Sequence, residues 1–307
     1  MRPHVEFIHS EDLRWHPAEL PLGHGQARQQ NLCYDEENGA ASTKVRFDGD
    51  WRRSAGYHAA DTEWFVLDGA VRLGERTLTR WGYFRAPAGL CVPDLEVAAG
   101  TEVLLFREYG DEAFTASDAD RSSFIPAGGN AATERPGELT VVSSGDDDPG
   151  WIENIYEGDA QSAMRLKMYY HDPSPPEDHA KGWLTNLCQG PAGWFGPGLE
   201  HHPCFEEAYL LEGSMDYNFG RMHAGGYFFR PAYVKHGDFR FDPEVPTTFV
   251  FRLDGDLINW MTEQSHVTHT GHALNYDADD ERVRPLVAGL PLRSSSAGEW
   301  SWDGGER

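Results

Sequence analysis

A stretch in the second half of the chain combines several side chains that can bind a metal ion. Residues 200–207 read Glu-His-His-Pro-Cys-Phe-Glu-Glu, which places two imidazoles and three carboxylates within eight positions. A further histidine, His236, ends a segment rich in glycine and aromatic residues. Imidazole nitrogen and carboxylate oxygen together suit a divalent first-row metal such as Fe(II), Mn, Ni, Cu or Zn. The sequence therefore predicts a metal site in this part of the chain.

The segments that must position these side chains have the composition of short β-strands. The chain contains 33 Gly and 19 Pro, which favour many strands and turns over long helices. Apolar or alternating segments bounded by Gly, Pro or Asp follow one another, as in a β-sandwich or closed barrel. In the first half they cover residues 44–47, 63–69, 70–74, 81–87 and 101–107. We expect an all-β fold.

The second half of the sequence repeats the first. Residues 63–69 align without gaps on residues 207–213, and residues 82–88 align on residues 226–232. Both alignments have the same offset, because 207 − 63 and 226 − 82 are each 144. A fixed offset of this kind indicates that one strand arrangement is used twice.

The repeat divides the chain into two predicted domains, residues 1–135 and residues 136–307, the second of which ends in a polar tail. The polar segment 109–150 contains the expected connection between them. Residues 1–45 are expected to form a leading arm of the first domain, with a strand at Val5–Ile8. Each domain is long enough to have its own hydrophobic core.

The overall charge excludes some classes of partner. The 307 residues include 50 Asp and Glu against 26 Lys and Arg, a formal charge of −24. Such a surface repels nucleic acids and anionic membranes, so we expect neither as a partner. The four cysteines form no Cys-x-x-Cys pair, no apolar run is long enough to span a bilayer, and residues 1–22 do not resemble a signal peptide. We expect a cytoplasmic protein.

The spacing of the ligand-type residues resembles that of the cupins. The first cupin motif is His-x-His, three or four residues, Glu, six residues, Gly; the second is Gly, five residues, Pro-x-Gly, two residues, His. The matching positions here are His202, Glu206, Gly213, Gly225, Pro231 and His236. The chain looks like a bicupin similar to the ChrR-type cupins. The resemblance implies two tandem jelly-roll (double-stranded β-helix) barrels, with one divalent metal, Fe(II) favoured, bound in the second by His202, Glu206 and His236.

The sequence departs from these motifs at two positions. Glu200 stands in place of the first histidine of the His-x-His motif, and Tyr233 stands in place of the glycine in Pro-x-Gly. Glu200 and His201 are both candidates for a fourth ligand. Strand alternation places Glu200 on the face of His202 and therefore favours it, whereas a β-bulge would favour His201. Glu200 and Tyr233 are also candidate catalytic residues, as general bases.

The first half contains fewer candidate ligands than the second. Aligned on the shared glycine turn, His58 takes the position of His202, Thr62 that of Glu206, and Val92 that of His236. A metal bound by His58 with nearby Asp61 and Glu63 is one alternative. The other is that the first barrel is a structural or dimerising copy.

Three functions are compatible with a metal site surrounded by aromatic residues. The first is a mononuclear non-haem metal dioxygenase that uses O2 to oxidise a small organic substrate. We also expect this chain to form a homodimer. The second is a metal-dependent lyase, isomerase or hydrolase, with Glu200, Glu207 or Tyr233 as general base. The third is a non-catalytic module that binds a ligand or senses a metal. Arg230, Lys235 and Arg240 are candidates to bind a substrate carboxylate.

Overall fold

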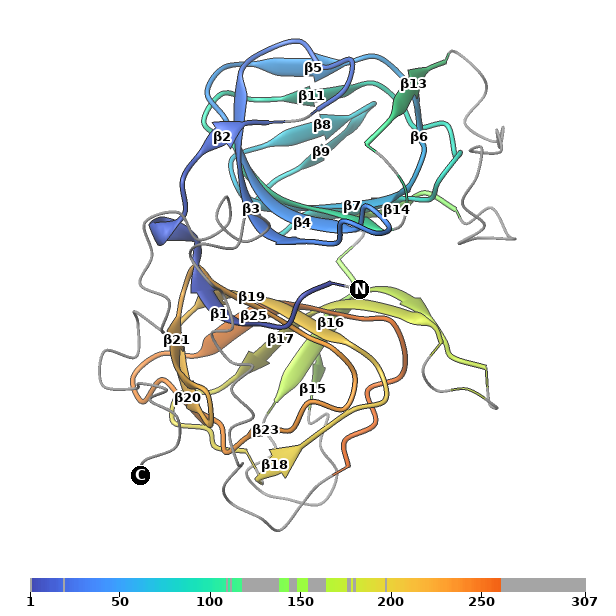
Figure 1. Ribbon diagram of the computed structural model, residues 1–307. Coiled ribbons are helices and arrows are strands. Elements are labelled where there is room, and N and C mark those ends of the chain that lie inside the picture. Colours follow the sequence, from blue (N-terminus) through green and yellow to red (C-terminus); the bar gives the residue numbers. More distant parts are fainter. Residues whose placement is uncertain are drawn as a thin grey trace. The chain divides into compact units, whose positions relative to one another are not determined.

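The computed structural model describes residues 2–18, 20–108, 110, 112–117, 138–143, 148–153, 164–175, 178, 181–196 and 198–260. The predicted C-terminal tail lies outside these residues. The described part of the chain consists of β-strands and one short 3-10 helix, η1 (Ser10–Asp12), and the expected all-β fold is confirmed (Figure 1). No helix within the described ranges has the length and apolar character needed to cross a membrane.

The chain forms two compact units. The first comprises Met1–Arg2 and Arg14–Asp148, and the second comprises Pro3–Leu13 and Pro149–Arg307. The sequence-based division at residue 135 differs from this arrangement in two respects. Pro3–Leu13 belongs to the second unit although it precedes the first, and the segment up to Asp148 belongs to the first.

The first unit contains one large and two smaller sheets among its described residues. Its strands are β2 (His16–Pro17), β3 (Ala27–Tyr34), β4 (Ala41–Phe47), β5 (Trp51–Arg53), β6 (Gly56–His58), β7 (Asp61–Asp68), β8 (Val71–Leu73), β9 (Arg76–Leu78), β10 (Tyr83–Ala86), β11 (Leu95–Val97), β12 (Glu102–Glu108), β13 (Phe114–Ala116) and β14 (Thr140–Val142). The large sheet has the order β14-β10-β7-β12-β4-β3-β2, the second β5-β11-β8-β9, and β13 pairs with β6. The prediction that residues 1–45 form a leading arm is therefore largely wrong. Strand β3, which lies within that range, pairs with β4 along most of its length.

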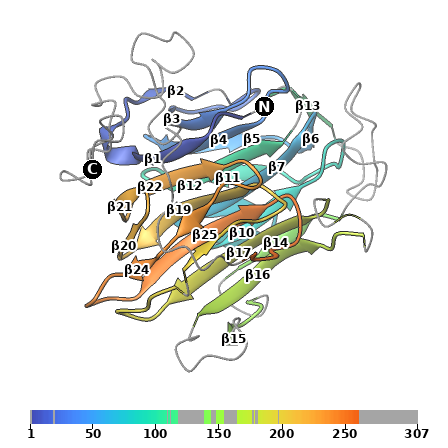
Figure 2. The same cartoon turned by 60° about the horizontal axis from the view of Figure 1, so that its bottom comes forward.

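The described strands of the second unit form a large sheet of equivalent order and two smaller sheets that differ from those of the first. They are β1 (Val5–His9), β15 (Ile152–Glu153), β16 (Arg165–Asp172), β17 (Trp183–Gly190), β18 (Leu199–Glu200), β19 (Glu206–Glu212), β20 (Ser214–Tyr217), β21 (Gly220–His223), β22 (Gly226–Arg230), β23 (His236–Gly237), β24 (Arg240–Phe241) and β25 (Thr247–Leu253). The large sheet has the order β1-β22-β19-β25-β17-β16-β15, and Figure 2 shows its central strands side by side. Smaller sheets are β21-β20-β24 and β18-β23.

The repeat seen in the sequence extends to backbone pairing near the predicted metal site. In the second unit, β18 pairs with β23 so that Glu200 is opposite His236. In the first unit, an isolated bridge joins Gly56 to Val92. Both pairs obey the same offset, because 200 − 56 and 236 − 92 are each 144. The two barrels therefore place equivalent backbone positions together and differ in the side chains found there.

Each unit has its own hydrophobic core. In the first, the indole of Trp64 stacks against the rings of Phe47 and Phe84, and all three are buried. In the second, the core includes Leu210 and Phe228. The alternation along β4, where Val45 is buried and Arg46 is exposed, follows from the opposite directions of successive strand side chains. All four cysteines are buried free thiols.

Gly69 and Gly213 form the equivalent turns that end β7 and β19. Their φ angles are +85° and +78°, in the left-handed region that glycine adopts at no steric cost. A Cβ atom at Gly69 would lie 2.8 Å from Thr101 Cα, and one at Gly213 would lie 2.8 Å from Pro246 O. Glycine is needed at both turns for conformation and for space.

β1 completes the large sheet of the second unit. It runs antiparallel to β22, with Val5 opposite Phe229 and His9 opposite Gly226. Every residue of the strand is buried, although the sequence Val-Glu-Phe-Ile-His includes two ionisable side chains. The partners of these two side chains therefore decide whether the strand can remain in place.

Candidate metal centre

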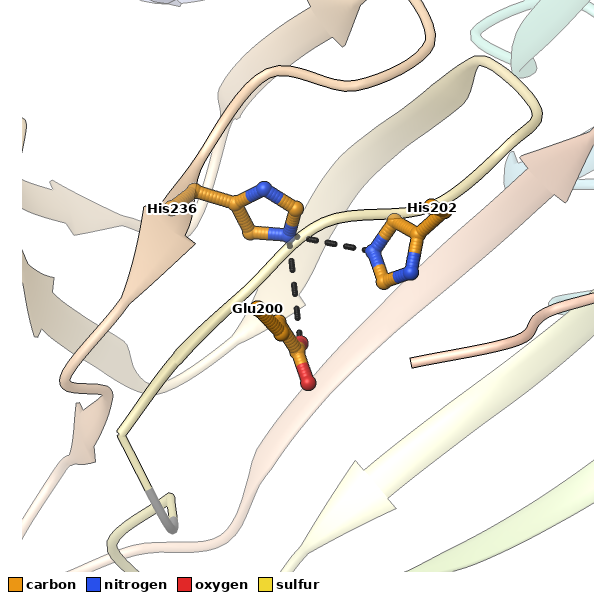
Figure 3. Close-up of side chains that lie close together, drawn as sticks. All are labelled: Glu200, His202 and His236. Carbon is orange, nitrogen blue, oxygen red and sulfur yellow. Dashed lines mark hydrogen bonds and ion pairs between the residues drawn. The ribbon is translucent and has the colours of Figure 1, made fainter. Parts of the chain in front are cut away.

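Glu200, His202 and His236 form a buried cluster in the second unit. Their potential ligand atoms all lie within 4.8 Å of one another. The Nε2 atoms of His202 and His236 are 3.2 Å apart, and Glu200 Oε1 lies 3.8 Å from His236 Nε2. Figure 3 shows the three side chains converging from two neighbouring segments of the barrel. The pairing of β18 with β23 brings Glu200 and His236 together.

Glu206, the first residue of β19, lies next to the two imidazoles. Its Oε2 atom is 2.9 Å from His236 Nε2 and 3.8 Å from His202 Nε2. Glu206 is 6% exposed and His236 is 1% exposed, so solvent screens this pair only weakly. Glu206 therefore contacts both imidazoles, although it lies outside the group of mutually close ligand atoms formed by Glu200, His202 and His236.

The spacing of the two imidazoles fits a shared metal ion. Nitrogen ligands bind first-row metals at about 2.0–2.1 Å, so two such ligands on one ion are roughly 3 Å apart. The observed separation of the His202 and His236 Nε2 atoms is 3.2 Å. The donor set of nitrogen and carboxylate oxygen is typical of Fe, Mn, Ni, Cu or Zn sites.

Hydrogen bonds from neighbouring residues orient the candidate ligands. His236 Nδ1 donates to Val234 O at 2.8 Å, which turns Nε2 toward the cluster. Asn259 Nδ2 donates to Glu200 Oε2 at 2.8 Å and leaves Oε1 facing His236. Such outer contacts hold ligands in the geometry that a metal requires.

Arg230 connects the cluster to strand β1. Its Nη1 donates to Glu206 Oε2 at 2.7 Å, and its Nε donates to both carboxylate oxygens of Glu6 at 2.8 and 2.9 Å. Glu6 also accepts from Tyr217 Oη at 2.6 Å and lies 2.9 Å from His4 Nε2. This buried network explains how Glu6 is accommodated in an otherwise apolar strand.

The buried charges alter the titration of the cluster. Burial raises the pKa of the Glu200 carboxyl to about 7, and the nearby Glu206 contributes in the same direction. Burial lowers the pKa of His202 to about 4, so its imidazole is neutral and able to bind a metal at neutral pH. Burial opposes ionisation of Glu206, but His236 and Arg230 outweigh it and hold the pKa of that carboxyl well below its usual range.

The cluster lies at the wall of an apolar cavity of about 350 Å³. Glu200, His202 and Glu206 contribute polar atoms to its lining. The apolar lining includes Leu184, Trp194, Phe228, Phe239, Phe241 and Phe251. A cavity of this size and character suits a small organic molecule placed beside a metal.

Comparison with known proteins identifies the family. A family model described as a domain of unknown function, DUF4437, matches residues 6–260. The chain belongs to the DUF4437 family. A comparison with curated proteins found no match.

The solved structures similar to this DUF4437 chain have the cupin fold. One, from Nostoc punctiforme PCC 73102, is described as a "putative dioxygenase"; it is 19% identical, with a TM-score of 0.62 over 86% of this chain and 87% of that one. The oxalate decarboxylase of Lactobacillus farciminis, solved as a formate complex, is 12% identical. Its TM-score is 0.53, and the match covers 84% of this chain and 88% of that one. That of Bacillus subtilis is 13% identical, with a TM-score of 0.51 over 83% and 78%. The expected cupin fold is confirmed.

The DUF4437 chain brings some of the sequence-predicted site residues together and leaves others apart. Glu200, His202, Glu206 and His236 converge. His201 points elsewhere, with its ring 5.3 Å from that of Trp260. Strand alternation, which places neighbouring side chains on opposite faces, accounts for this difference.

The side chains of Tyr233, Lys235 and Arg240 are exposed, whereas Arg230 is buried and adjoins the cluster through Glu206. Tyr233 is 61% exposed, has a positive φ of 68°, and stacks against Trp260. Lys235 and Arg240 are exposed, and Arg230 is engaged by Glu6 and Glu206. None of these side chains lines the cavity of the second unit. The geometry therefore supports neither Tyr233 as a general base nor the three cations as groups that bind a substrate carboxylate.

The three candidate ligands of the first unit do not form a cluster in the DUF4437 chain. Asp61 accepts from Arg85, and Glu63 accepts from Tyr83 Oη at 2.8 Å. His58 Nε2 instead lies 2.9 Å from Arg53 Nη2. Among the described residues, Glu200, His202 and His236 form the one group of three side chains placed closely enough to hold a metal ion.

Sequence reasoning did not find Glu6 or Asn259 as parts of the site. Glu6 lies 224 positions from Arg230, and Asn259 lies 59 positions from Glu200. Nothing in the local sequence pattern links these pairs. An acidic residue within an apolar strand, as in Val5–Ile8, was the available signal, since buried carboxylates need a partner.

Proposed function

We propose that this protein is a metal-dependent enzyme of the non-haem dioxygenase class that acts on a small organic substrate in the second barrel. The observation that carries this proposal is the convergence of His202, His236 and Glu206, with Glu200, at the wall of an apolar cavity. A two-histidine, one-carboxylate set with open positions is typical of non-haem Fe(II) oxygenases. The similarity to the Nostoc protein supports the same class.

The residues of the site would have separate roles. His202, His236 and Glu206 would hold the metal, and Glu200 would be a fourth ligand or exchange a proton through Oε1. A bound Fe(II) would supply a redox-active centre accessible to substrate and O2. The aromatic walls, including Phe239 and Phe251, would exclude water and orient the substrate.

A second candidate function is a non-redox lyase, isomerase or hydrolase with the metal as Lewis acid. The position of Glu200 favours this alternative, because its buried carboxyl group lies beside the cluster, with Oε1 3.8 Å from His236 Nε2, where a general acid or base is needed. The similarity to two oxalate decarboxylases is compatible with it. A non-catalytic module that binds a ligand tightly without turnover is the third candidate.

Metal analysis of the purified protein tests the site on which all three candidates depend. We expect about one transition metal ion per chain and its loss in His236→Ala, because the variant removes one of a small number of ligands. His171→Ala, which changes an exposed histidine on β16, is the matched control and should retain the metal. Equal metal content in His236→Ala and the control would overturn the proposed ligand set.

Oxygen uptake separates the candidate reactions. The Fe(II)-loaded protein should consume O2 with at least one member of a panel of enols, catechols and thiols. Substrate turnover by the Zn-loaded protein without O2 would instead support the Lewis-acid alternative. No consumption of O2 with any member of the panel would contradict the dioxygenase class.

Several further expectations belong to the same proposal. They are a homodimer, a closer relationship to the ChrR-type bicupins, a cytoplasmic location, and no nucleic-acid or membrane partner. The formal charge of −24 supports the last of these. Size-exclusion chromatography with light scattering measures the oligomeric state directly.

A further inference from the structure

The first unit contains a cavity at the position that corresponds to the metal centre of the second. Its volume is about 310 Å³, and its lining includes Arg53 on β5, His58 on β6 and Thr62 on β7. Figure 1 shows these strands around the interior of the same barrel. His58 and Thr62 are the equivalents of His202 and Glu206 at the offset of 144. The repeat has therefore kept the cavity and one histidine, and has a threonine hydroxyl in place of the carboxylate of Glu206.

Arg53 provides a buried positive charge in this cavity. Its side chain is 3% exposed, and no carboxylate in the described part of the chain forms an ion pair with it. The ring of Phe114 covers one face of the guanidinium, with Cζ 3.8 Å from the ring centroid. Burial lowers the pKa of Arg53 to about 9, so the group is still a cation at neutral pH.

His58 fixes the orientation of this guanidinium. An arginine N–H can only donate, so Arg53 Nη2 donates to an unprotonated His58 Nε2 at 2.9 Å. Burial, together with the charge of Arg53, places the pKa of His58 well below its usual range, and the imidazole stays neutral. The guanidinium has five N–H donors, and the bond to His58 uses one of them. The others have no acceptor within the described ranges.

The remaining charges that line the cavity compensate each other. Arg107 Nη1 lies 3.0 Å from Glu112 Oε1, so these two side chains form an ion pair. The net charge of the lining is consequently that of Arg53. A buried cation without a counter-ion is costly, and an anion that enters the cavity would relieve that cost.

We propose that the first barrel binds a small organic carboxylate, held by Arg53 in the cavity that it shares with His58. The planar guanidinium can donate two parallel hydrogen bonds to a carboxylate. Leu20, Leu105 and Trp64 supply apolar surface for the rest of the ligand. In the second barrel the equivalent positions form a site for a cation, whereas here they form a site for an anion. This site is independent of the function proposed for the second barrel.

Carboxylates compared with their neutral amides test the proposal. The full-length protein, treated with a chelator to empty the other barrel of metal, is titrated calorimetrically with benzoate, phenylacetate, hexanoate and glutarate and with the amide of each. We expect at least one acid at about 10 mM to bind and raise the melting temperature, while its amide does not. Absence of binding by every acid, or equal binding of acid and amide, would overturn the proposal.

Substitution of Arg53 assigns the binding to this site. Arg53→Met should reduce carboxylate affinity at least about tenfold, and its ligand-free melting temperature should be equal or higher because an unpaired buried charge is removed. Arg72→Met, which changes an exposed arginine paired with Glu96, is the matched control and should bind as the parent protein does. Unchanged affinity in Arg53→Met would refute the assignment.

A second variant decides the question if Arg53→Met does not fold. Arg53→Lys keeps the positive charge and loses the planar pair of donors. We expect it to bind the carboxylate more weakly than the parent protein and still to prefer it over the amide. If Arg53→Lys binds the carboxylate as tightly as the parent protein does, or if it no longer prefers the acid over the amide, the proposed binding mode is contradicted.

Discussion

Glu6 and Arg230 lie 224 positions apart in the sequence, and their side chains form a buried ion pair in the second barrel. Arg230 also donates to Glu206, which contacts His236 and His202. The ionised state of Glu6 is thereby connected, through two charged side chains, to the candidate metal ligands. The strand that completes the sheet and the candidate metal site depend on the same arginine.

Glu6→Gln should weaken both the fold and the metal site. The amide keeps the shape of the carboxylate but leaves Arg230 with one acidic partner, which should cost about 3 kcal/mol in the free energy of unfolding. Metal affinity should fall by about 10- to 100-fold, because Glu206 loses its fixed position. Denaturant titration and a competition assay with a chelating dye measure the two effects.

Glu11→Gln serves as the matched control for Glu6→Gln. Glu11 is exposed in the same segment, and it lies 3.7 Å from a partly exposed His223. We expect stability and metal affinity close to those of the parent protein, since exposed pairs contribute little. Equal metal affinity in both variants would show that Arg230 positions Glu206 without help from Glu6.

The ion pair between Glu6 and Arg230 should also make the free energy of unfolding depend on pH in the acid range. Arg230 and His4 overcome the effect of burial and lower the pKa of Glu6 from 4.5 to about 2. Because the folded-state pKa is the lower one, the stabilisation is complete above about pH 4.5 and is lost as pH falls toward 2. Its size is on the order of 3 kcal/mol. The difference in unfolding free energy between the parent protein and Glu6→Gln should shrink over this window, and a constant difference would contradict the linkage.

The turn at Gly213 should not tolerate a side chain. Gly213→Ala introduces a Cβ atom 2.8 Å from Pro246 O in a backbone with a positive φ. Gly193→Ala has a similar φ of +71° but open space around the Cβ, so it isolates the conformational cost, about 1 kcal/mol. We expect Gly213→Ala to cost about 1–3 kcal/mol more in thermal or chemical unfolding. Similar losses in the two variants would mean that the neighbouring strand moves aside.

The fourth ligand position can be assigned by comparing His201→Ala with Glu200→Gln. Glu200 lies 3.8 Å from His236 Nε2, whereas His201 packs against Trp260. We therefore expect His201→Ala to retain its metal and Glu200→Gln to bind it about tenfold more weakly or worse. The opposite order in a metal competition titration would favour the bulged arrangement that places His201 in the site.

Much of the scaffold could be predicted from local sequence. The apolar segments at 63–69 and 207–213 gave strands because their period and terminal glycines are local properties. The spacing of His202, Glu206 and His236 indicated a shared site because it resembles the spacing of the two cupin motifs. Strand alternation also ranked Glu200 above His201 for a fourth ligand.

The features that sequence reasoning missed depend on contacts between distant segments. The strand at Val5–Ile8 was expected, but its partner is β22, and an apolar strand carries no local signal of which edge it joins. Arg230 was interpreted as a substrate-binding cation because its partner Glu6 could not be known. The pair of Arg53 and His58 was missed because Arg53 matches no motif and His58 was considered only as a metal ligand.

The incorporation of β1 into the second barrel has a consequence for biosynthesis. β1 ends at His9 and its partner β22 begins at Gly226, so the 216 residues from 10 to 225 are translated between them. At about 5–20 residues per second, β1 waits roughly 10–40 s on the ribosome before its partner emerges, with Val5, Phe7 and Ile8 unprotected. A C-terminal fragment expressed alone would lack this strand, and its open β22 edge would be exposed to aggregation. Joining residues 3–13 to such a fragment through a flexible linker should restore a folded barrel.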